Sequence, residues 1–223
     1  MEHLLLLILH VIGVAIGVGA AFTSDPLFIS SIRNRRISSD QLVLLHAQSR
    51  VVLGGLTLVI LSGIGLVWFH PGHLLDGIFL AKMTIVFVIA ADGAVFHLKV
   101  LPILEDHVDE NLDEALLCEQ LPLLSASGAT SSVSWFSALI LGLLLAVELP
   151  YLLLINIYLI LVVSASIVAY LVLSLLIFTP QPEPEEVLAH ERFERAFGWL
   201  PAVLAVVVLG VIAVAIGHAT AVA

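Results

Sequence analysis

Six long apolar stretches constrain this chain more than any other feature of its sequence. Each is about 18 residues or longer, the length that an α-helix needs to cross the hydrocarbon core of a bilayer. Of the 223 residues, 61% are hydrophobic and only 12% are charged, about half the charged share of a soluble domain. The sequence therefore predicts an all-α, polytopic transmembrane helix bundle that forms a single integral membrane domain over residues 1–223. The expected spans are 3–22, 41–69, 77–101, 129–149, 151–178 and 196–219.

The uneven distribution of basic residues predicts how these helices are oriented. With six spans, the connections alternate between the two sides of the membrane, and seven of the eight Lys and Arg residues fall on one side. Those seven are Arg33, Arg35, Arg36, Arg50, Lys99, Arg192 and Arg195, and the eighth is Lys82. Short connections rich in Lys and Arg stay in the cytoplasm, so we expect both termini to face outside. The expected location is the cytoplasmic membrane of a bacterium or archaeon, with the helices in contact with the lipid bilayer.

The connection after the third span has a different pattern. Leu104, Val108, Leu112 and Leu116 recur every four residues, and acidic residues lie between them. This pattern predicts an amphipathic helix over 103–117 that lies at the cytoplasmic interface. Its acidic face is interpreted as a solvated surface, with a bound cation or a basic partner as the alternative.

Several classes of function are excluded by composition. The basic residues are few and form no extended stripe, so we expect no nucleic-acid binding. Cys118 is the only cysteine, which leaves no intrachain disulfide and no pair of cysteines for a redox or zinc site. The sequence also contains no nucleophile–base pair and no phosphate-binding loop.

Four histidines within or at the rim of the apolar stretches are the main candidate functional residues. An ionisable side chain in a membrane span is costly and marks a candidate site, and histidine is the usual ligand of haem iron. At about 1.5 Å of rise per residue, His10 and His218 lie in the outer half, and His46 and His97 lie near the inner side. These depths predict two haem sites, or a single axial ligand at His10.

The helical face that carries His10 is lined by small residues. His10 shares this face with Gly13, Gly17, Ala21 and Ser24. A histidine above such a smooth strip can accept a flat macrocycle. Small residues spaced by four are also the common means by which membrane helices approach closely, so both interpretations stay open.

The inner histidines have a charged neighbour. His46 and His97 have equal depth on spans that a short turn makes neighbours, so they form a candidate bis-imidazole site in which Arg50 pairs with a haem propionate. In the alternative, Arg50 pairs with Asp92 or Asp25 and His46 faces interfacial water.

Asp92 is the costliest single residue of the predicted spans. A lone carboxylate inside the bilayer should be paired or protonated, and Arg50 is its best candidate partner. Viewed down the axis of the third span, Lys82 and His97 lie on nearly the same side of the helix. This span therefore has a polar-edged face directed into the bundle. These residues could form a proton relay.

The segment from Leu9 to Gly17, with His10 and Gly13, resembles the opening helix of small bacterial membrane proteins of the HemJ and CopD type. Residues 82–102 and 132–142 resemble, in addition, an uncharacterised group of bacterial integral membrane proteins. In the HemJ-like group a first-helix histidine and a third-helix lysine accompany b-type haem and protoporphyrinogen oxidation, and the resemblance implies that His10 and Lys82 take these places. The CopD likeness would imply copper, which the scarcity of methionine and cysteine disfavours.

Together these features favour a b-type haem-binding membrane protein with one or two haems. Its role would be electron transfer or, if it is an enzyme, a membrane oxidoreductase reaction, with a quinone or a redox protein as partner. The alternatives are a proton or ion translocator that uses Asp92, Arg50 and His97, and an accessory subunit of a larger membrane complex or homo-oligomer. The candidate haem-binding residues are His10, His46, His97, His218, Lys82 and Arg50, with His10 and His97 as iron ligands.

Overall fold

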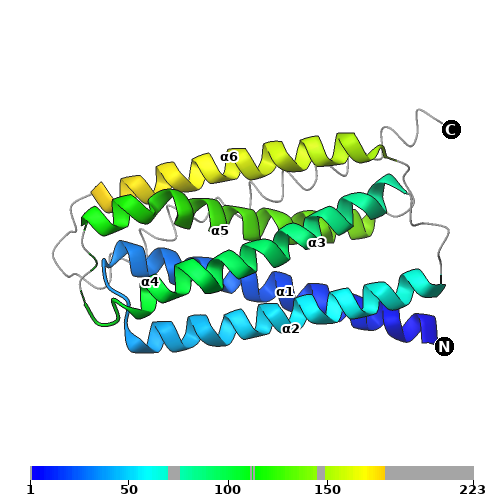
Figure 1. Cartoon of the computed structure of the whole chain (residues 1–223), viewed down its shortest axis with the longest axis horizontal. Coiled ribbons are helices and arrows are strands. Elements are labelled where there is room, and N and C mark those ends of the chain that lie inside the picture. Colours follow the sequence, from blue (N-terminus) through cyan, green and yellow to red (C-terminus); the bar gives the residue numbers. More distant parts are fainter. Residues whose placement is uncertain (1, 70–75, 111, 113, 145–148, 179–223) are drawn as a thin grey trace, which may run out of the picture. The chain divides into compact units, whose positions relative to one another are not determined.

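The computed structural model describes residues 2–69, 76–110, 112, 114–144 and 149–178. All of these except Leu144 belong to one compact unit. Over the described residues the chain is helical, and its single β-type pairing is an isolated bridge between Ile37 and Val108. The elements are α1 (Glu2–Arg33), α2 (Ser39–Phe69), α3 (Gly77–Val95), a π-helical turn η2 (Phe96–Val100), α4 (Leu101–Glu105), α5 (Glu114–Leu143) and α6 (Tyr151–Phe178) (Figure 1).

Five helical stretches are long and apolar enough to cross a membrane. They are His3–Ile32, Ser39–Phe69, Gly77–Glu105, Ala115–Leu143 and Tyr151–Phe178. The all-helical class is therefore confirmed, and the described part of the chain fits a multi-pass membrane protein. The expected sixth span at 196–219, with His218 in it, lies outside the described residues.

The outward faces of these helices carry large apolar side chains. Trp68 is 84% exposed, Leu98 77% and Phe87 72%. Exposed apolar surface of this extent is rare on soluble monomers, whereas lipid tails solvate such side chains. The surface is thus compatible with contact with a bilayer.

The first helix is longer than the sequence predicts. We expected it to end at residue 22, before Thr23-Ser24-Asp25-Pro26, but α1 continues through Pro26 to Arg33. The Ser24 hydroxyl donates to the Ala20 carbonyl at 2.8 Å, and the Thr23 hydroxyl donates to the Gly19 carbonyl at 3.0 Å. Membrane helices tolerate an internal proline because hydroxyls and neighbouring helices satisfy the backbone groups around it.

The predicted amphipathic helix over 103–117 is wrong. The third span continues through η2 and α4 to Glu105, the chain then turns, and α5 begins at Glu114. Asp109 takes a left-handed conformation with φ of 60°, which interrupts a helix. Like charges spaced by four residues, with no lysine or arginine between them, also disfavour a helix here.

The fourth span begins far earlier than the predicted residue 129, because α5 starts at Glu114 and includes Pro122. Leu117, Leu121 and Leu124 recur at helical spacing and are buried. They join an apolar cluster with residues from α1, η2, α4 and α6. Packing in this cluster offsets the weak local preference of a segment rich in small and polar residues.

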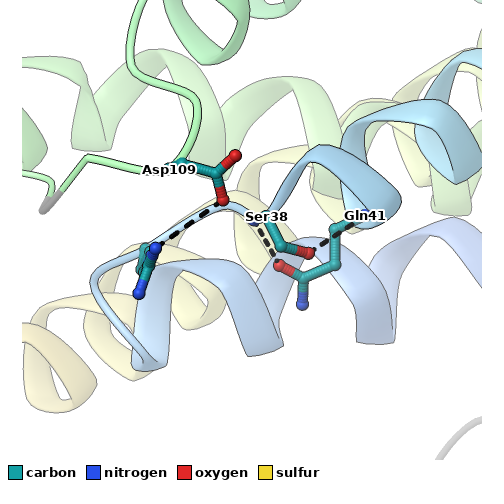
Figure 2. Close-up of polar contacts among 4 residues, drawn as sticks. Ser38, Gln41 and Asp109 are labelled. Carbon is teal, nitrogen blue, oxygen red and sulfur yellow. Dashed lines mark hydrogen bonds and ion pairs between the residues drawn. The ribbon is translucent and has the colours of Figure 1, made fainter.

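Two short loops, 34–38 and 106–112, meet at one end of the bundle, which we call the loop end. The Asp109 amide donates to the Ile37 carbonyl at 2.9 Å, and the Arg36 guanidinium lies 3.7 Å from the Asp109 carboxylate. Ser38 and Gln41 form a capping box at the start of α2. The Gln41 backbone amide donates to the Ser38 hydroxyl at 3.2 Å, and the Ser38 backbone amide donates to the Gln41 side-chain oxygen at 3.0 Å. Figure 2 shows this capping box beside Asp109.

The helices pack as two main pairs. α1 packs most extensively against α2, and α5 packs most extensively against α6 (Figure 1). α3 packs mainly against α5 and contacts α2 only slightly. The expectation that the second and third spans are close neighbours is therefore wrong along most of their length, because α5 lies against α3 instead.

The α1–α2 contact depends on three glycines. A Cβ on Gly13 would lie 3.1 Å from the Gly55 carbonyl oxygen, and a Cβ on Gly55 would lie 2.9 Å from the Gly17 amide nitrogen. A Cβ on Gly17 would lie 2.1 Å from the ring of Trp135, which is buried. The small-residue face of α1 is thus occupied by helix packing and not by a macrocycle, in line with the second interpretation of this face.

The glycine contact predicts a large difference between two alanine substitutions on the same helix. Gly17→Ala should lower the free energy of unfolding by about 1–3 kcal/mol, because the new methyl group overlaps Trp135. Gly19→Ala should be neutral or slightly stabilising, because its Cβ meets nothing within 4 Å. Thermal unfolding in detergent measures both, and equal melting temperatures would contradict the packing described here.

Candidate functional site

A cavity of about 320 Å³ lies inside the compact unit, in the half nearer the loop end. Residues of α1, α2, α3 with η2, and α5 line it. Its volume falls at the small end of ligand pockets, which span about 300–1,000 Å³. Most of its wall is apolar, with polar groups at a few positions. The polar lining consists of Ser24, Asp25, Ser49, Asp92, His97, Ser127 and Ser131.

Two carboxylates from different helices line this cavity. Asp25 comes from α1 and accepts a hydrogen bond from the Ser132 hydroxyl. Asp92 comes from α3 and lies near Ser127 of α5, which is 7% exposed. Among the residues that the structure describes, no lysine or arginine forms an ion pair with either carboxylate. At Asp25 a hydroxyl donor thus takes the place of the basic partner that a buried carboxylate usually has.

Helix α1 positions Asp25 through the same face that packs on α2. Asp25 follows Gly17 by eight residues, so it lies on the packed side of α1, and Ala21 between them is buried and also lines the cavity. The glycine contact therefore directs this part of α1 toward α5, where Ser132 bonds to the carboxylate.

His97 reaches the cavity from the π-helical turn. A π-turn contains an extra residue per turn, which shifts the helical face, and such turns are frequent at functional sites. The Nε2 atom of His97 lies 2.8 Å from the Ser49 hydroxyl of α2. This bond bridges the third span and α2 at the edge of the cavity.

His46 has a different partner from the one expected. Its Nε2 atom lies 2.9 Å from the Glu105 carboxylate, and both side chains are partly exposed, at 34% and 45%. His46 and Ser49 are one turn apart on α2, so both histidines do lie toward the loop end, as their predicted depths required. The Nε2 atom of each ring already has its own partner, so the described arrangement does not pair the rings as a bis-imidazole site.

Near the other end of the bundle, His10 is held by a serine. The Ser62 hydroxyl donates to the Leu58 carbonyl, and the Nδ1 atom of His10 lies 3.0 Å from that hydroxyl oxygen. In the tautomer in which Nδ1 of His10 donates to Ser62, Nε2 keeps its lone pair. Lys82 lies close enough to His10 to act on it electrostatically.

Arg50 does not take the place that the sequence suggested. Its side chain is exposed on α2, and no ion pair joins it to Asp92 or Asp25 within the described part of the chain.

The sequence interpretation missed Asp25 as a site residue. It was assigned to the end of the first helix because Pro26 follows it. The sequence contains a signal for it, since Ser24 lies on the same helical face as His10, Gly17 and Ala21. If the helix continues through Pro26, Asp25 lies next to that face, inside the bundle.

Comparisons with models of protein families, with curated proteins and with solved structures find no match to this chain. The likeness to HemJ and CopD proteins therefore stays a prediction. Among the described residues, no cluster of three or more His, Cys, Asp or Glu side chains could hold a metal ion.

The polar lining predicts that water enters the cavity. Thiols react as thiolates, which form in water and not in lipid. On a Cys118→Ser background, Ser131→Cys should be modified by a small polar thiol reagent at least about tenfold faster than Phe87→Cys, which faces outward from α3. Equal rates, measured by mass spectrometry of the intact protein in membranes, would contradict a hydrated cavity.

Proposed function

We propose that this protein moves protons or another small cation across a membrane through the cavity, with Asp25 and Asp92 as the groups that take up and release the ion. The observation that carries the proposal is that two carboxylates from different helices line one cavity without a basic partner among the described residues. Ionisable groups inside a membrane bundle are expensive and mark ion pathways and proton relays. A purely structural role would be served as well by apolar side chains of similar volume.

The neighbouring polar groups supply a route toward the loop end. Ser132 bonds to Asp25 and Ser127 lies near Asp92, and hydroxyls both donate and accept, so they can pass a proton along. His97 lies at the edge of the same cavity and bonds to Ser49, and an imidazole exchanges protons near neutral pH. The proposed relay therefore contains Asp25, Asp92 and His97, and it leaves out Arg50.

The loop end is proposed to face the cytoplasm. The Arg35 guanidinium donates to the Ile177 carbonyl at the end of α6, and Arg36 and Lys99 are exposed at the same end. Basic residues in short loops remain on the cytoplasmic side. This orientation places the N-terminus outside, in the cytoplasmic membrane of a bacterium or archaeon.

Proton flux in liposomes tests this proposal. The wild-type chain, reconstituted with a pH-sensitive dye inside and a potassium diffusion potential, should acidify or alkalinise the lumen according to the sign of the potential. Asp92→Asn should reduce the rate by about tenfold or more, because an amide cannot take up the proton. Asp109→Asn is the matched control, since it makes the same change at a carboxylate that lies outside the cavity. Flux that survives Asp25→Asn and Asp92→Asn together would exclude the proposed route.

A second candidate function rests on His10. We propose, as the alternative, that His10 is the axial ligand of one b-type haem, with electron transfer as the role and a quinone or a redox protein as the partner. The supporting observation is the bond from Nδ1 of His10 to Ser62, which leaves Nε2 available. Histidines that bind metals usually donate their other ring N–H in this way. Lys82 would then interact with the haem propionates, as the HemJ resemblance implies.

Absorbance spectra decide this alternative independently of transport. Expression with added haem precursor should give a purified protein with a Soret band and sharp α and β bands after reduction by dithionite. His10→Ala should abolish these bands, whereas His97→Ala should keep them, because Nε2 of His97 bonds to Ser49. A wild-type spectrum without a Soret band would exclude the haem role.

A further inference from the structure

The wall of the cavity is unusually apolar for a pathway that serves protons alone. Besides the two carboxylates, it contains the aromatic side chains of Phe28, Phe96 and Trp135. A proton relay needs only a file of hydroxyls, carboxylates and water molecules. A volume of about 320 Å³ bounded by aromatic rings is instead suited to a molecule with carbon atoms.

We propose that the cavity binds a compact organic ammonium ion, which Asp25 and Asp92 hold in exchange for a proton. This inference rests on the proposed transport function and names the class of substrate that would use the same site. Aromatic rings bind quaternary ammonium groups through their negative faces. Carboxylates supply the opposite charge that a cation needs in a lipid-enclosed space.

An inorganic cation fits the same lining less well. Ca²⁺ and Mg²⁺ take six or more oxygen ligands at short range. The Asp25 carboxylate already accepts from Ser132, and most of the wall is carbon. An ammonium ion with alkyl substituents needs only nearby negative charge and apolar contact.

The exchange balances in charge. The charged or titratable groups that line the cavity are Asp25 on α1, Asp92 on α3 and His97 on η2, whereas α2 and α5 contribute hydroxyls and apolar side chains. Two carboxylates in one lipid-enclosed space repel each other, so one proton held between them stabilises the empty site. When a monovalent ammonium ion enters, that proton leaves, and the net charge of the site is unchanged.

Equilibrium binding to the purified full chain in detergent tests the inference, with radiolabelled choline and tetramethylammonium as a matched pair of probes. The wild type should bind both and should release one proton for each cation in weakly buffered solution. Asp25→Asn and Asp92→Asn should each weaken binding by about tenfold or more, and Asp109→Asn should not. Size-exclusion elution shows whether each variant is folded.

The outcomes separate this inference from the transport proposal. If neither cation binds the folded wild type, or if binding is unchanged in the double Asp25→Asn and Asp92→Asn variant, the inference is overturned, even where proton flux persists. Carboxylate-dependent binding with proton release supports the inference, and it does so even if liposomes show no flux, which would overturn transport alone.

Discussion

The close approach of α1 and α2 at Gly13, Gly17 and Gly55 is the constraint on which the rest of the structure depends. Helices that touch through backbone atoms leave no room for side chains between them, and in a bilayer such van der Waals contact is a main source of association. The ring of Trp135 lies against Gly17 and draws α5 into the same contact. Ala21, one turn after Gly17 on α1, and Trp135 both line the cavity.

The position of this cavity explains why the chain can keep two carboxylates inside its spans. Asp25 accepts a hydrogen bond from a serine hydroxyl of α5, and a second serine of α5 lies near Asp92. The serines and carboxylates form the polar part of an otherwise apolar lining. Under the proposed function, water or a cation enters this cavity and the carboxylates select its charge. The π-turn η2 adds His97 to the same site.

Much of the architecture follows from apolar length alone, because a stretch such as 151–178 has only one plausible structure in lipid. The starts and ends were harder to predict. Pro26 signals a break, but α1 continues through it, and leucine packing drew the polar segment after Glu114 into α5. The errors in the helix ends also affected the prediction of site residues. Asp92 is recognisable by its depth in the third span, whereas Asp25 falls outside the first span when that span is taken to end at residue 22. The pairing of His46 with Glu105 depends on the tertiary path of the chain.

The central claim is that Asp25 and Asp92, which are far apart in the sequence, face one shared space. The most direct measurement is chemical bridging of a double variant, Asp25→Cys with Asp92→Cys on a Cys118→Ser background, by a short bifunctional thiol reagent in membranes. Proteolysis between the two positions then shows whether the fragments stay joined. The control pairs Asp25→Cys with Phe87→Cys, whose side chain faces outward from the same helix as Asp92. The account predicts that the reagent joins the first pair and not the control, and failure to join the first pair in the folded protein would contradict it.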